Sequence, residues 1–266
     1  MPYATILKKI VEHKKKEVET AKGRRPQDQL EKRISDIGPT RNFLAALARK
    51  ERISLIAEIK KASPSAGVIR PDFDPMEIAR VYEHEGADAI SILTDEEFFQ
   101  GSLVTLSMVK QNFSLPCLRK DFIIDPYQIY EARAFGADAV LLIVSLLSPE
   151  TLSSYIKIAG DLGLSCLVEI HTREELMIAE YSGAEIIGIN NRDLVSFAVD
   201  IEQTFRLLPA FSTNALRVSE SGIKTPNDIA RLRKAGVDAA LIGTAFMKAD
   251  DIGQAVRKLL DESRQC

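Results

Sequence analysis

The chain has 266 residues and a formal net charge of -3, with 45% hydrophobic and 27% charged residues. This apolar content supports a sizeable core and excludes a disordered chain, while the nearly balanced charge argues against binding to nucleic acid or to a membrane surface. No apolar run approaches the roughly 20 residues of a membrane span, and the first residues lack the apolar stretch of a signal peptide, so we expect a cytoplasmic protein.

Residues 1–50 form a basic segment that is predicted to be helical. It holds 13 Lys and Arg residues against 6 Asp and Glu residues, and its apolar residues recur at a helical spacing from Ile6 to Val18. The lysine run 14–16 is expected to face water. A nucleic-acid-binding arm is one interpretation of this charge, but a solvated helix face is favoured. We therefore predict that residues 1–50 are a helical extension packed on a main body formed by residues 51–266.

After residue 50 the chain alternates short apolar runs with amphipathic helical stretches. Several runs are apolar on both faces, as parallel strands covered by helices are. The eight predicted strands are 53–60, 88–95, 116–122, 138–145, 165–171, 184–190, 215–221 and 238–244. Helical stretches lie between them, and four that open with a proline are 75–85, 126–135, 149–162 and 226–235. Neighbouring parallel strands require crossovers of this length.

A short motif repeats along this part of the chain. Segments that read Gly-Ala-Asp, Gly-Ala-Glu or Gly-Val-Asp begin at Gly86, Gly136, Gly183 and Gly236, with spacings of 50, 47 and 53 residues. Each glycine stands where a helix is expected to end in a left-handed residue, before every second strand. Alternate-strand repetition suits a closed barrel, whereas a doubly wound open sheet would show a GxGxxG after its first strand. The predicted fold is α/β, a single (β/α)8 TIM barrel with an N-terminal helical extension.

Charged and amide residues lie almost only at the carboxyl ends of the predicted strands. Glu58 and Lys60 are two residues apart, so both point to one side of the sheet, and apolar helices cover the other side. Both side chains are therefore expected in the barrel mouth, where active sites of this fold lie. The further candidates on this rim are Lys120, Glu169, Asn190, Arg192, Glu220 and Ser221. Solvation of strand ends would explain one such pair, but six strands that converge on one rim indicate an active site.

Two short glycine motifs and one long loop predict a phosphate site at the same rim. Ser-Gly at 221–222 follows the seventh strand and Gly-Thr at 243–244 follows the eighth, where barrels of this class bind phosphate through backbone N–H groups. Gly-Thr alone is a common turn, but the pair indicates a phosphorylated small-molecule substrate. The loop 61–71 is either a lid or plain irregular surface, and Ser63 would donate to the phosphate in a closed form.

The two mouth lysines, Lys60 and Lys120, allow two kinds of chemistry. A lysine in an apolar, cation-rich site is neutral and forms a Schiff base. Beside Glu58, Glu169 and anionic substrate groups it stays protonated and acts as a general acid, which is the favoured interpretation. With three histidines and three widely spaced cysteines, the chain shows no metal-ligand cluster, so we expect no metal and no cofactor. The cysteines are predicted to be reduced core thiols.

The segment IAEIKKASPSAG at 56–67 resembles the signature loop of the indole-3-glycerol-phosphate synthases. Further segments similar to motifs of that family follow in the right order: LTDEEFFQGS (93–102), LRKDFIID (118–125), LVEIHTREE (167–175), GINNRDL (188–194), SESGI (219–223) and LIGTAFM (241–247). The resemblance covers roughly residues 3–262, including N-terminal helices that the family adds over the barrel top. It implies the monofunctional form, because no second barrel follows.

The resemblance implies a carboxy-lyase that converts 1-(2-carboxyphenylamino)-1-deoxyribulose 5-phosphate to indole-3-glycerol phosphate with loss of CO2 and water. By family analogy Lys120 is the general acid of ring closure. Lys60 with Glu58 is the candidate acid of the dehydration, and Glu169 is its base or stabilises the cationic intermediate. The residues expected to orient the hydroxyls and the carboxylate are Asn190, Glu220 and Arg192, and those expected to hold the phosphate are Ser63, Ser221, Gly222, Gly243 and Thr244.

Several assignments stay open at this point. Phe99 and Phe122 either wall the anthranilate ring or belong to the core, and His171 shares the face of Glu169 but is assigned a structural role. Another phosphate-binding barrel enzyme, either a sugar-phosphate isomerase or a Schiff-base aldolase, and a non-catalytic ligand-binding barrel remain as alternatives. A monomer is expected, because no exposed apolar helix is evident in the sequence.

Overall fold

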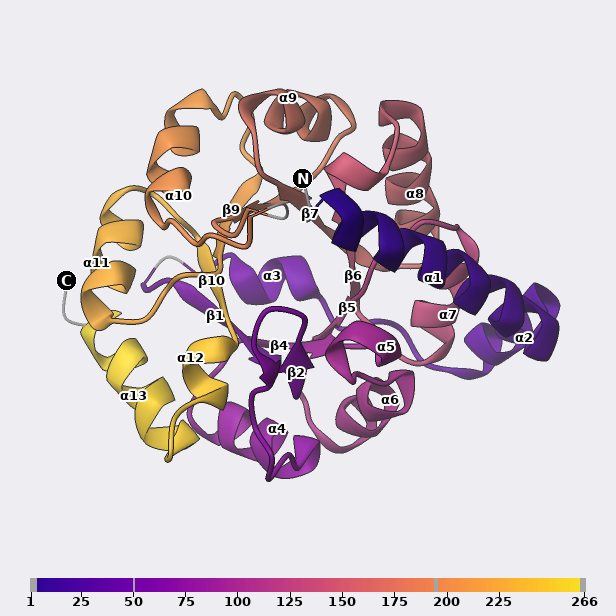
Figure 1. Cartoon of the computed structure of the whole chain (residues 1–266), viewed down its shortest axis with the longest axis horizontal. Coiled ribbons are helices and arrows are strands. Elements are labelled where there is room, and N and C mark those ends of the chain that lie inside the picture. The colour runs from indigo at the N-terminus through magenta and orange to yellow at the C-terminus, as the bar shows by residue number, and fades with distance from the viewer. Residues whose placement is uncertain (1–3, 50, 194–195, 264–266) are drawn as a thin grey trace.

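A computed structural model describes residues 4–49, 51–193 and 196–263. Within them eight parallel strands close into a barrel in the order β1-β10-β9-β8-β7-β6-β5-β4. The strands are β1 (Ser54–Ile59), β4 (Ala89–Leu93), β5 (Cys117–Lys120), β6 (Ala139–Ile143), β7 (Ser165–Ile170), β8 (Ile186–Asn190), β9 (Leu216–Glu220) and β10 (Ala239–Ile242). Each lies inside the range predicted for it, so the predicted (β/α)8 barrel is confirmed (Figure 1).

Helices form a ring around the barrel. The helices that connect successive strands are α4 (Pro75–His84), α6 (Leu103–Asn112), α7 (Tyr127–Ala134), α8 (Pro149–Asp161), α9 (Arg173–Tyr181), α10 (Glu202–Leu207) and α11 (Pro226–Lys234), and α13 (Ile252–Ser263) follows the last strand. Short elements lie in the connections: β2 (Ala62–Ser63), β3 (Gly67–Val68), α5 (Glu96–Phe99), η1 (Val144–Leu146), η2 (Leu208–Ala210) and α12 (Thr244–Met247). Three predicted helices begin with their proline in the first turn, and α7 begins directly after Pro126.

The repeated glycine motif ends four helices and starts every second strand. Gly86, Gly136, Gly183 and Gly236 have φ angles of 86°, 90°, 80° and 88°, the left-handed conformation that was predicted for them. The acidic residue of the motif has a function of its own. In three of the four repeats its carboxylate accepts a hydrogen bond from a backbone N–H of the preceding strand, at 2.7–2.8 Å; the pairs are Leu55 with Asp88, Cys117 with Asp138, and Arg217 with Asp238. The motif thus fixes neighbouring strands at the amino-terminal end of the barrel.

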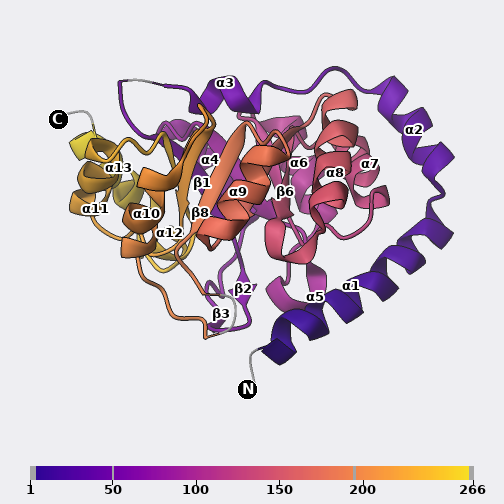
Figure 2. The ribbon, with the colours of Figure 1, turned by 90° about the horizontal axis from the view of Figure 1, so that it is seen from above.

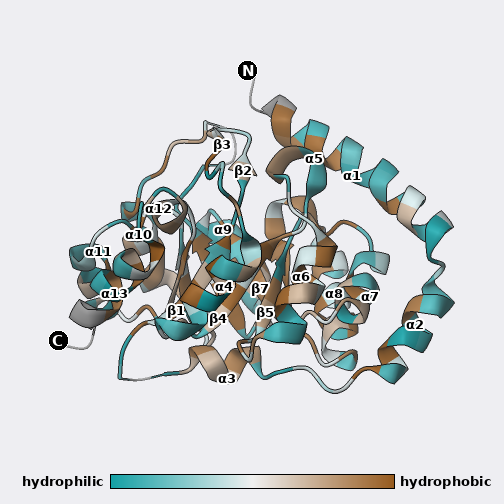
Figure 3. Cartoon of the chain, turned by 90° about the horizontal axis from the view of Figure 1, so that it is seen from below, coloured by the Kyte–Doolittle hydropathy of each residue, from teal (hydrophilic) through white to brown (hydrophobic). Residues whose placement is uncertain are grey.

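Two apolar layers hold the molecule together. One lies between the strands and the surrounding helices, and the other fills the barrel interior with side chains such as Ile56, Leu118, Leu167 and Val218. Figure 3 shows the largely hydrophobic strands and the mostly hydrophilic outer faces of the N-terminal helices. Among the described residues, no helix combines the length and the apolar character needed to cross a membrane.

The N-terminal segment consists of α1 (Ala4–Arg24), α2 (Gln27–Asp36) and α3 (Phe43–Leu47). Figure 2 shows α1 on the side of β2 and β3, α2 on the flank and α3 at the opposite end of the barrel. Phe43 and Leu47 of α3 are fully buried against the barrel interior, so α3 closes the end away from α1. The predicted boundary at residue 50 falls on a residue outside the described ranges.

The structure corrects one expectation for this segment. Lys14 was predicted to face water with Lys15 and Lys16, but its side chain is fully buried while its two neighbours are exposed. It lies one helical turn from the buried Ile10 and Val18, so it belongs to the packed face of α1. Its Nζ is 2.9 Å from carboxylate oxygens of both Asp95 and Asp121.

The carboxylates keep Lys14 charged. Burial by itself lowers the pKa of Lys14, but Asp121, Asp95 and Glu17 raise it above its ordinary value. Burial likewise raises the pKa of Asp121, whereas Lys14 and Arg119 together hold it well below the usual range. Lys14 therefore joins α1 to the ends of β4 and β5 through a buried ionic cluster.

We expect Lys14→Met to destabilise the protein by about 3–5 kcal/mol, because it leaves the buried Asp95 without a cation and Asp121 with Arg119 alone. Urea unfolding followed by circular dichroism measures the loss. Lys15→Met is the matched control, since this exposed neighbour should change stability by no more than about 0.5 kcal/mol. Equal unfolding midpoints for the two variants would show that the cluster contributes nothing to stability.

Two cysteines are free thiols, as predicted: Cys117 is buried and Cys166 is half-buried. Burial raises the pKa of each thiol to about 12, so both stay protonated at neutral pH. Cys266 lies outside the described residues.

Candidate active site

The strand pattern places the polar residues above the inner core. On β1, β5, β7 and β9 a buried apolar side chain of the barrel interior is followed two residues later by a charged one; the pairs are Ile56 with Glu58, Leu118 with Lys120, Leu167 with Glu169, and Val218 with Glu220. Side chains two residues apart on a strand point the same way. The charged groups therefore lie at the carboxyl ends of the strands, above the apolar side chains that fill the barrel interior.

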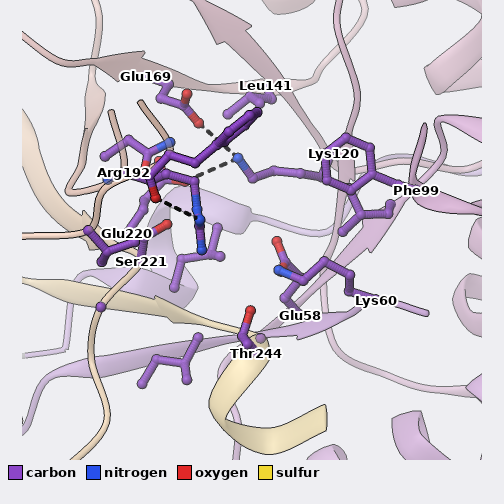
Figure 4. Close-up of a pocket in the computed structure, with 18 of the residues that line it drawn as sticks. Glu58, Lys60, Phe99, Lys120, Leu141, Glu169, Arg192, Glu220, Ser221 and Thr244 are labelled. Carbon is purple, nitrogen blue, oxygen red and sulfur yellow. Dashed lines mark hydrogen bonds and ion pairs between the residues drawn. The ribbon is translucent and has the colours of Figure 1, made fainter. Parts of the chain in front are cut away.

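These side chains face a cavity of about 440 Å³. The predicted site residues that line it are Glu58, Lys60, Phe99, Lys120, Phe122, Glu169, Asn190, Arg192, Glu220, Ser221, Gly222, Gly243 and Thr244. Figure 4 shows Lys120 reaching between Glu169 on one side and the pair of Glu58 and Lys60 on the other. Ser63 is not part of the lining; it lies in β2, which pairs with β3 in the loop after β1.

Lys120 is held by two carboxylates. Its Nζ lies 2.8 Å from Oε2 of Glu169 and 3.2 Å from Oε2 of Glu220. Burial lowers the pKa of Lys120, but Glu169, Glu220 and Glu58 outweigh it and raise this pKa above its ordinary value. Lys120 is therefore protonated at neutral pH, which favours an acid over a Schiff-base nucleophile.

The two glutamates around Lys120 differ in their environment. Burial raises the pKa of Glu169, but Lys120 and His171 outweigh it and hold this pKa below the ordinary value. Burial also raises the pKa of Glu220, and with the charge of Glu169 it reaches about 7 although Lys120 lowers it. Oε1 of Glu220 is buried without a hydrogen-bond partner among the described residues.

Lys60 and Glu58 form a second pair, in direct contact on the opposite side of the cavity. Both side chains come from the end of β1, as their spacing predicted. Lys60 is thus a second lysine in the cavity lining, and it is paired with the carboxylate of Glu58.

Ser221, Gly222, Gly243 and Thr244 line the end of the cavity that was predicted to hold phosphate. Ser221 and Gly222 have φ angles of 66° and 81°, so two successive residues adopt the left-handed conformation at this turn. Two exposed lysines, Lys224 and Lys248, also line the cavity and were missed because nothing in their local sequence distinguishes them from ordinary surface lysines.

Gly243 and Gly188 have a role that their sequence context did not reveal. A Cβ at Gly243 would overlap the carboxylate of Glu58, and one at Gly188 would overlap that of Glu220. At both positions a carboxylate of the cavity occupies the space that a side chain would need. A glycine inside a strand, as at Gly188, is a signal from which such a close approach can be inferred, but it was not used.

Part of the cavity lining is apolar. The rings of Phe99 and Phe122 lie 6.1 Å apart between centroids, at an angle of 42°, and both line the cavity while staying half-buried. Their exposure to the cavity favours a wall for an aromatic substrate over plain core packing. Ile6, Leu7 and Ile10 of α1 also line the cavity, although their spacing in the sequence indicated only a helix packed on the barrel.

Arg192 is fixed at the edge of the cavity. Its backbone N–H donates to Oδ1 of Asn190 at 3.0 Å, and its Nη1 donates to the carbonyl of Phe197 at 3.2 Å. Burial lowers the pKa of Arg192, and the negative charge of Glu58 acts against this effect. The guanidinium therefore offers a partly desolvated cation for a carboxylate or phosphate. Within the described ranges, no group of three or more His, Cys, Asp or Glu side chains is arranged to hold a metal ion.

Comparison with solved structures shows the fold. A 3-hexulose-6-phosphate synthase from Salmonella typhimurium superposes with a TM-score of 0.66 at 16% identity, over 80% of this chain and 99% of that chain. A thiamine phosphate pyrophosphorylase from Pyrococcus furiosus superposes with a TM-score of 0.61 at 20% identity, over 84% of this chain and 98% of that chain. At these identities the likeness concerns the barrel alone.

Comparison of sequences shows the family. The family model for indole-3-glycerol phosphate synthase matches residues 7–259. An indole-3-glycerol phosphate synthase of Chloroherpeton thalassium is 52% identical over 249 residues, which are 92% of this chain and 96% of that protein. One of Thermoanaerobacter pseudethanolicus is 53% identical over 248 residues, which are 93% and 94% of the two chains. With a full-length family match, close relatives and a mouth that carries two cation–carboxylate clusters, the chain belongs to the indole-3-glycerol phosphate synthase family.

Proposed function

We propose that Lys120 is the general acid of the reaction that this family catalyses, the conversion of 1-(2-carboxyphenylamino)-1-deoxyribulose 5-phosphate to indole-3-glycerol phosphate. The observation that carries this assignment is the position of its Nζ, which two buried carboxylates hold 2.8 Å and 3.2 Å away inside the cavity. A protonated amine fixed in this way meets the substrate in one orientation.

The cavity suits the two ends of this substrate. The phosphate is proposed to lie against the backbone of 221–222 and 243–244, with Lys224 and Lys248 nearby to balance its charge. The carboxyphenyl ring is proposed to lie against Phe99 and the apolar side chains of α1. The deoxyribulose carbons then pass Lys120 in the middle of the cavity. Ser63 remains a proposed phosphate donor only if the loop 61–71 closes.

Ring closure requires an acid at the ketone. The ring carbon that bears the carboxylate attacks the ketone carbon, the C=O π electrons move to oxygen, and Lys120 donates its proton there. Loss of CO2 returns the bonding electrons to the ring and restores its aromaticity. Each such positioned proton transfer is typically worth about 10²–10⁴-fold in rate.

Dehydration requires a second acid and a base. We propose that Lys60, paired with Glu58, protonates the hydroxyl on the former ketone carbon, so that its C–O bond breaks and water leaves a cationic intermediate, which Glu169 stabilises. Glu169 then accepts a proton from the neighbouring ring CH2 group, and the electrons of that C–H bond form the C=C bond of the indole. Asn190 and Glu220 are proposed to orient the substrate hydroxyls, and Arg192 the carboxylate before it leaves as CO2.

The reaction is tested directly by fluorescence. The chain contains no tryptophan, so its own indole emission is absent and the product indole is the only indole chromophore in the cuvette. We expect indole emission to grow with time when the substrate is added to the purified protein. Covalent trapping of a sugar phosphate on Lys60 or Lys120 by borohydride would instead indicate a Schiff-base aldolase.

A monomeric state and a cytoplasmic location belong to the same proposal. Sedimentation equilibrium should give the mass of one chain, and cell fractionation should recover the activity with the soluble cytoplasmic proteins. No nucleic acid or membrane partner is proposed, because the substrate is a small phosphorylated molecule.

A further inference from the structure

His171 lies directly after β7, with its ring between two carboxylates. Its Nε2 is 3.6 Å from Oε1 of Glu169, and its Nδ1 is 3.4 Å from Oε2 of Glu175 at the start of α9. The side chain is 15% exposed, and it is not part of the cavity lining. It therefore lies beside Glu169 but outside the cavity lining.

The backbone of His171 is held from two helices. Its N–H donates to Oε2 of Glu175 at 2.6 Å, and its carbonyl accepts a hydrogen bond from Nε2 of Gln203 in α10, also at 2.6 Å. The N-terminus of α9 is itself capped by Thr172, which fixes Glu175 in the first turn. These contacts leave the ring little freedom to turn away from the carboxylates.

The positions of the two ring nitrogens determine the charge of the ring. A neutral imidazole has an N–H on only one of its two nitrogens. The lone pair of the other nitrogen would then point at a carboxylate oxygen and be repelled by it. The imidazolium has an N–H on each nitrogen and suits both carboxylates. Nε2 is buried and has no hydrogen-bond partner among the described residues, so its proton is free to approach Glu169.

The other charged groups near this ring are also acidic. The ring faces Glu169 on β7, Glu175 on α9 and, farther away, Glu220 on β9, while α10 contributes only the neutral amide of Gln203. Burial lowers the pKa of His171, but Glu175, Glu169 and Glu220 outweigh it and raise this pKa above its ordinary value. The neighbouring carboxylates thus favour the imidazolium, the same charge state that the positions of the two ring nitrogens indicate.

We infer that His171 is a positioning residue, whose imidazolium bridges Glu169 and Glu175 and holds the Glu169 carboxylate as an oriented anion for the proton transfers of dehydration. This inference replaces the purely structural role expected for His171, and it rests on the proposed role of Glu169. Lys120 occupies the other oxygen of Glu169, so the carboxylate is fixed from both sides. When Lys120 releases its proton to the ketone, His171 is the cation that remains beside Glu169.

The test is the pH dependence of His171→Asn. Without the imidazolium the pKa of Glu169 should rise and its carboxylate should be less well oriented. The acid limb of the single-turnover rate should therefore move upward by about one pH unit and the plateau rate should fall, while KM stays within about twofold. Indole emission under single-turnover conditions gives the rate without interference from product release. A pH profile that superposes on that of the unmodified protein would overturn the inference.

Two further variants separate positioning from structural support. Gln203→Ala removes the bond to the His171 carbonyl but leaves the ring between its carboxylates, so its pH profile should not move. Glu175→Gln keeps an acceptor for the His171 N–H but removes the outer carboxylate, so the imidazolium should lose its proton at lower pH and activity should decline earlier on the alkaline side. If His171→Asn does not fold, an unchanged alkaline limb in Glu175→Gln overturns the inference instead.

Failure of the underlying proposal has a different signature. Glu169→Gln in an otherwise unmodified chain should abolish most of the turnover. If that variant keeps its rate, Glu169 is not the base and the proposed function of the residue is wrong. If Glu169→Gln is inactive but His171→Asn keeps its pH profile, only the role of His171 is wrong.

Discussion

Lys120→Ala is expected to lower kcat by at least about 100-fold. The ketone oxygen then develops negative charge with no positioned acid beside it, and water cannot enter the same geometry between Glu169 and Glu220. KM should change less than kcat, because the phosphate end of the cavity and its apolar wall are untouched. Steady-state indole fluorescence over a range of substrate concentrations separates the two constants.

The control for this variant is Lys157→Ala. Lys157 lies on the exposed face of α8, where it pairs with Asp161, so its removal should leave turnover unchanged. We expect Lys120→Ala to fold, because Glu169 and Glu220 can share a proton once the lysine is gone. Thermal unfolding shows whether the fold is retained. Near-normal turnover in a folded Lys120→Ala protein would contradict the general-acid assignment.

The barrel was predictable because its signals are local and repeated. Strands that are apolar on both faces, helix-length crossovers and a glycine before every second strand are each visible within a short window of sequence. The acidic residue of the repeat was visible as well, but its hydrogen bond to the preceding strand was not. That bond joins Asp88 to Leu55 and Asp138 to Cys117, residues that become neighbours only when adjacent strands pair.

The charged part of the site was predictable from strand periodicity. A period of two places Glu58 above Ile56 and Lys120 above Leu118, and the fold brings the strand ends to one rim. The roles of Gly188 and Gly243 depend on which carboxylate of the neighbouring strand occupies the space beside them, so they required the structure.

The N-terminal helix shows where sequence reasoning fails. Lys14 has the spacing of the buried residues Ile10 and Val18, but an isolated lysine in a basic helix is normally solvated. Its burial depends on Asp95 and Asp121, which are about 80 and 107 positions away along the chain. No local pattern reports a partner at that distance. For the same reason the contribution of Ile6 to the cavity wall was not foreseen.

Gly188→Ala is expected to lower kcat/KM by about 100-fold or more, although it adds a single methyl group. The new Cβ would overlap Oε1 of Glu220 and lie 3.1 Å from Cδ1 of Leu167, so the carboxylate must move. Glu220 is one of the two partners of Lys120, and a displacement of about 1 Å in such a site can cost about 100-fold. Indole fluorescence measures the rate, and urea unfolding should show a loss of about 1–3 kcal/mol from overpacking.

A shorter carboxylate should relieve the crowding at Gly188. Glu220→Asp shortens the side chain by one methylene group. In the Glu220→Asp background, Gly188→Ala should therefore lower kcat/KM far less than it does in the unmodified protein. Gly160→Ala is the matched control, because this exposed glycine of α8 has nothing within 4 Å of a new Cβ, and the change should be neutral or slightly stabilising. If instead the losses from Gly188→Ala and Glu220→Asp simply add, the methyl group acts elsewhere, and Gly188 does not make room for the carboxylate that holds Lys120.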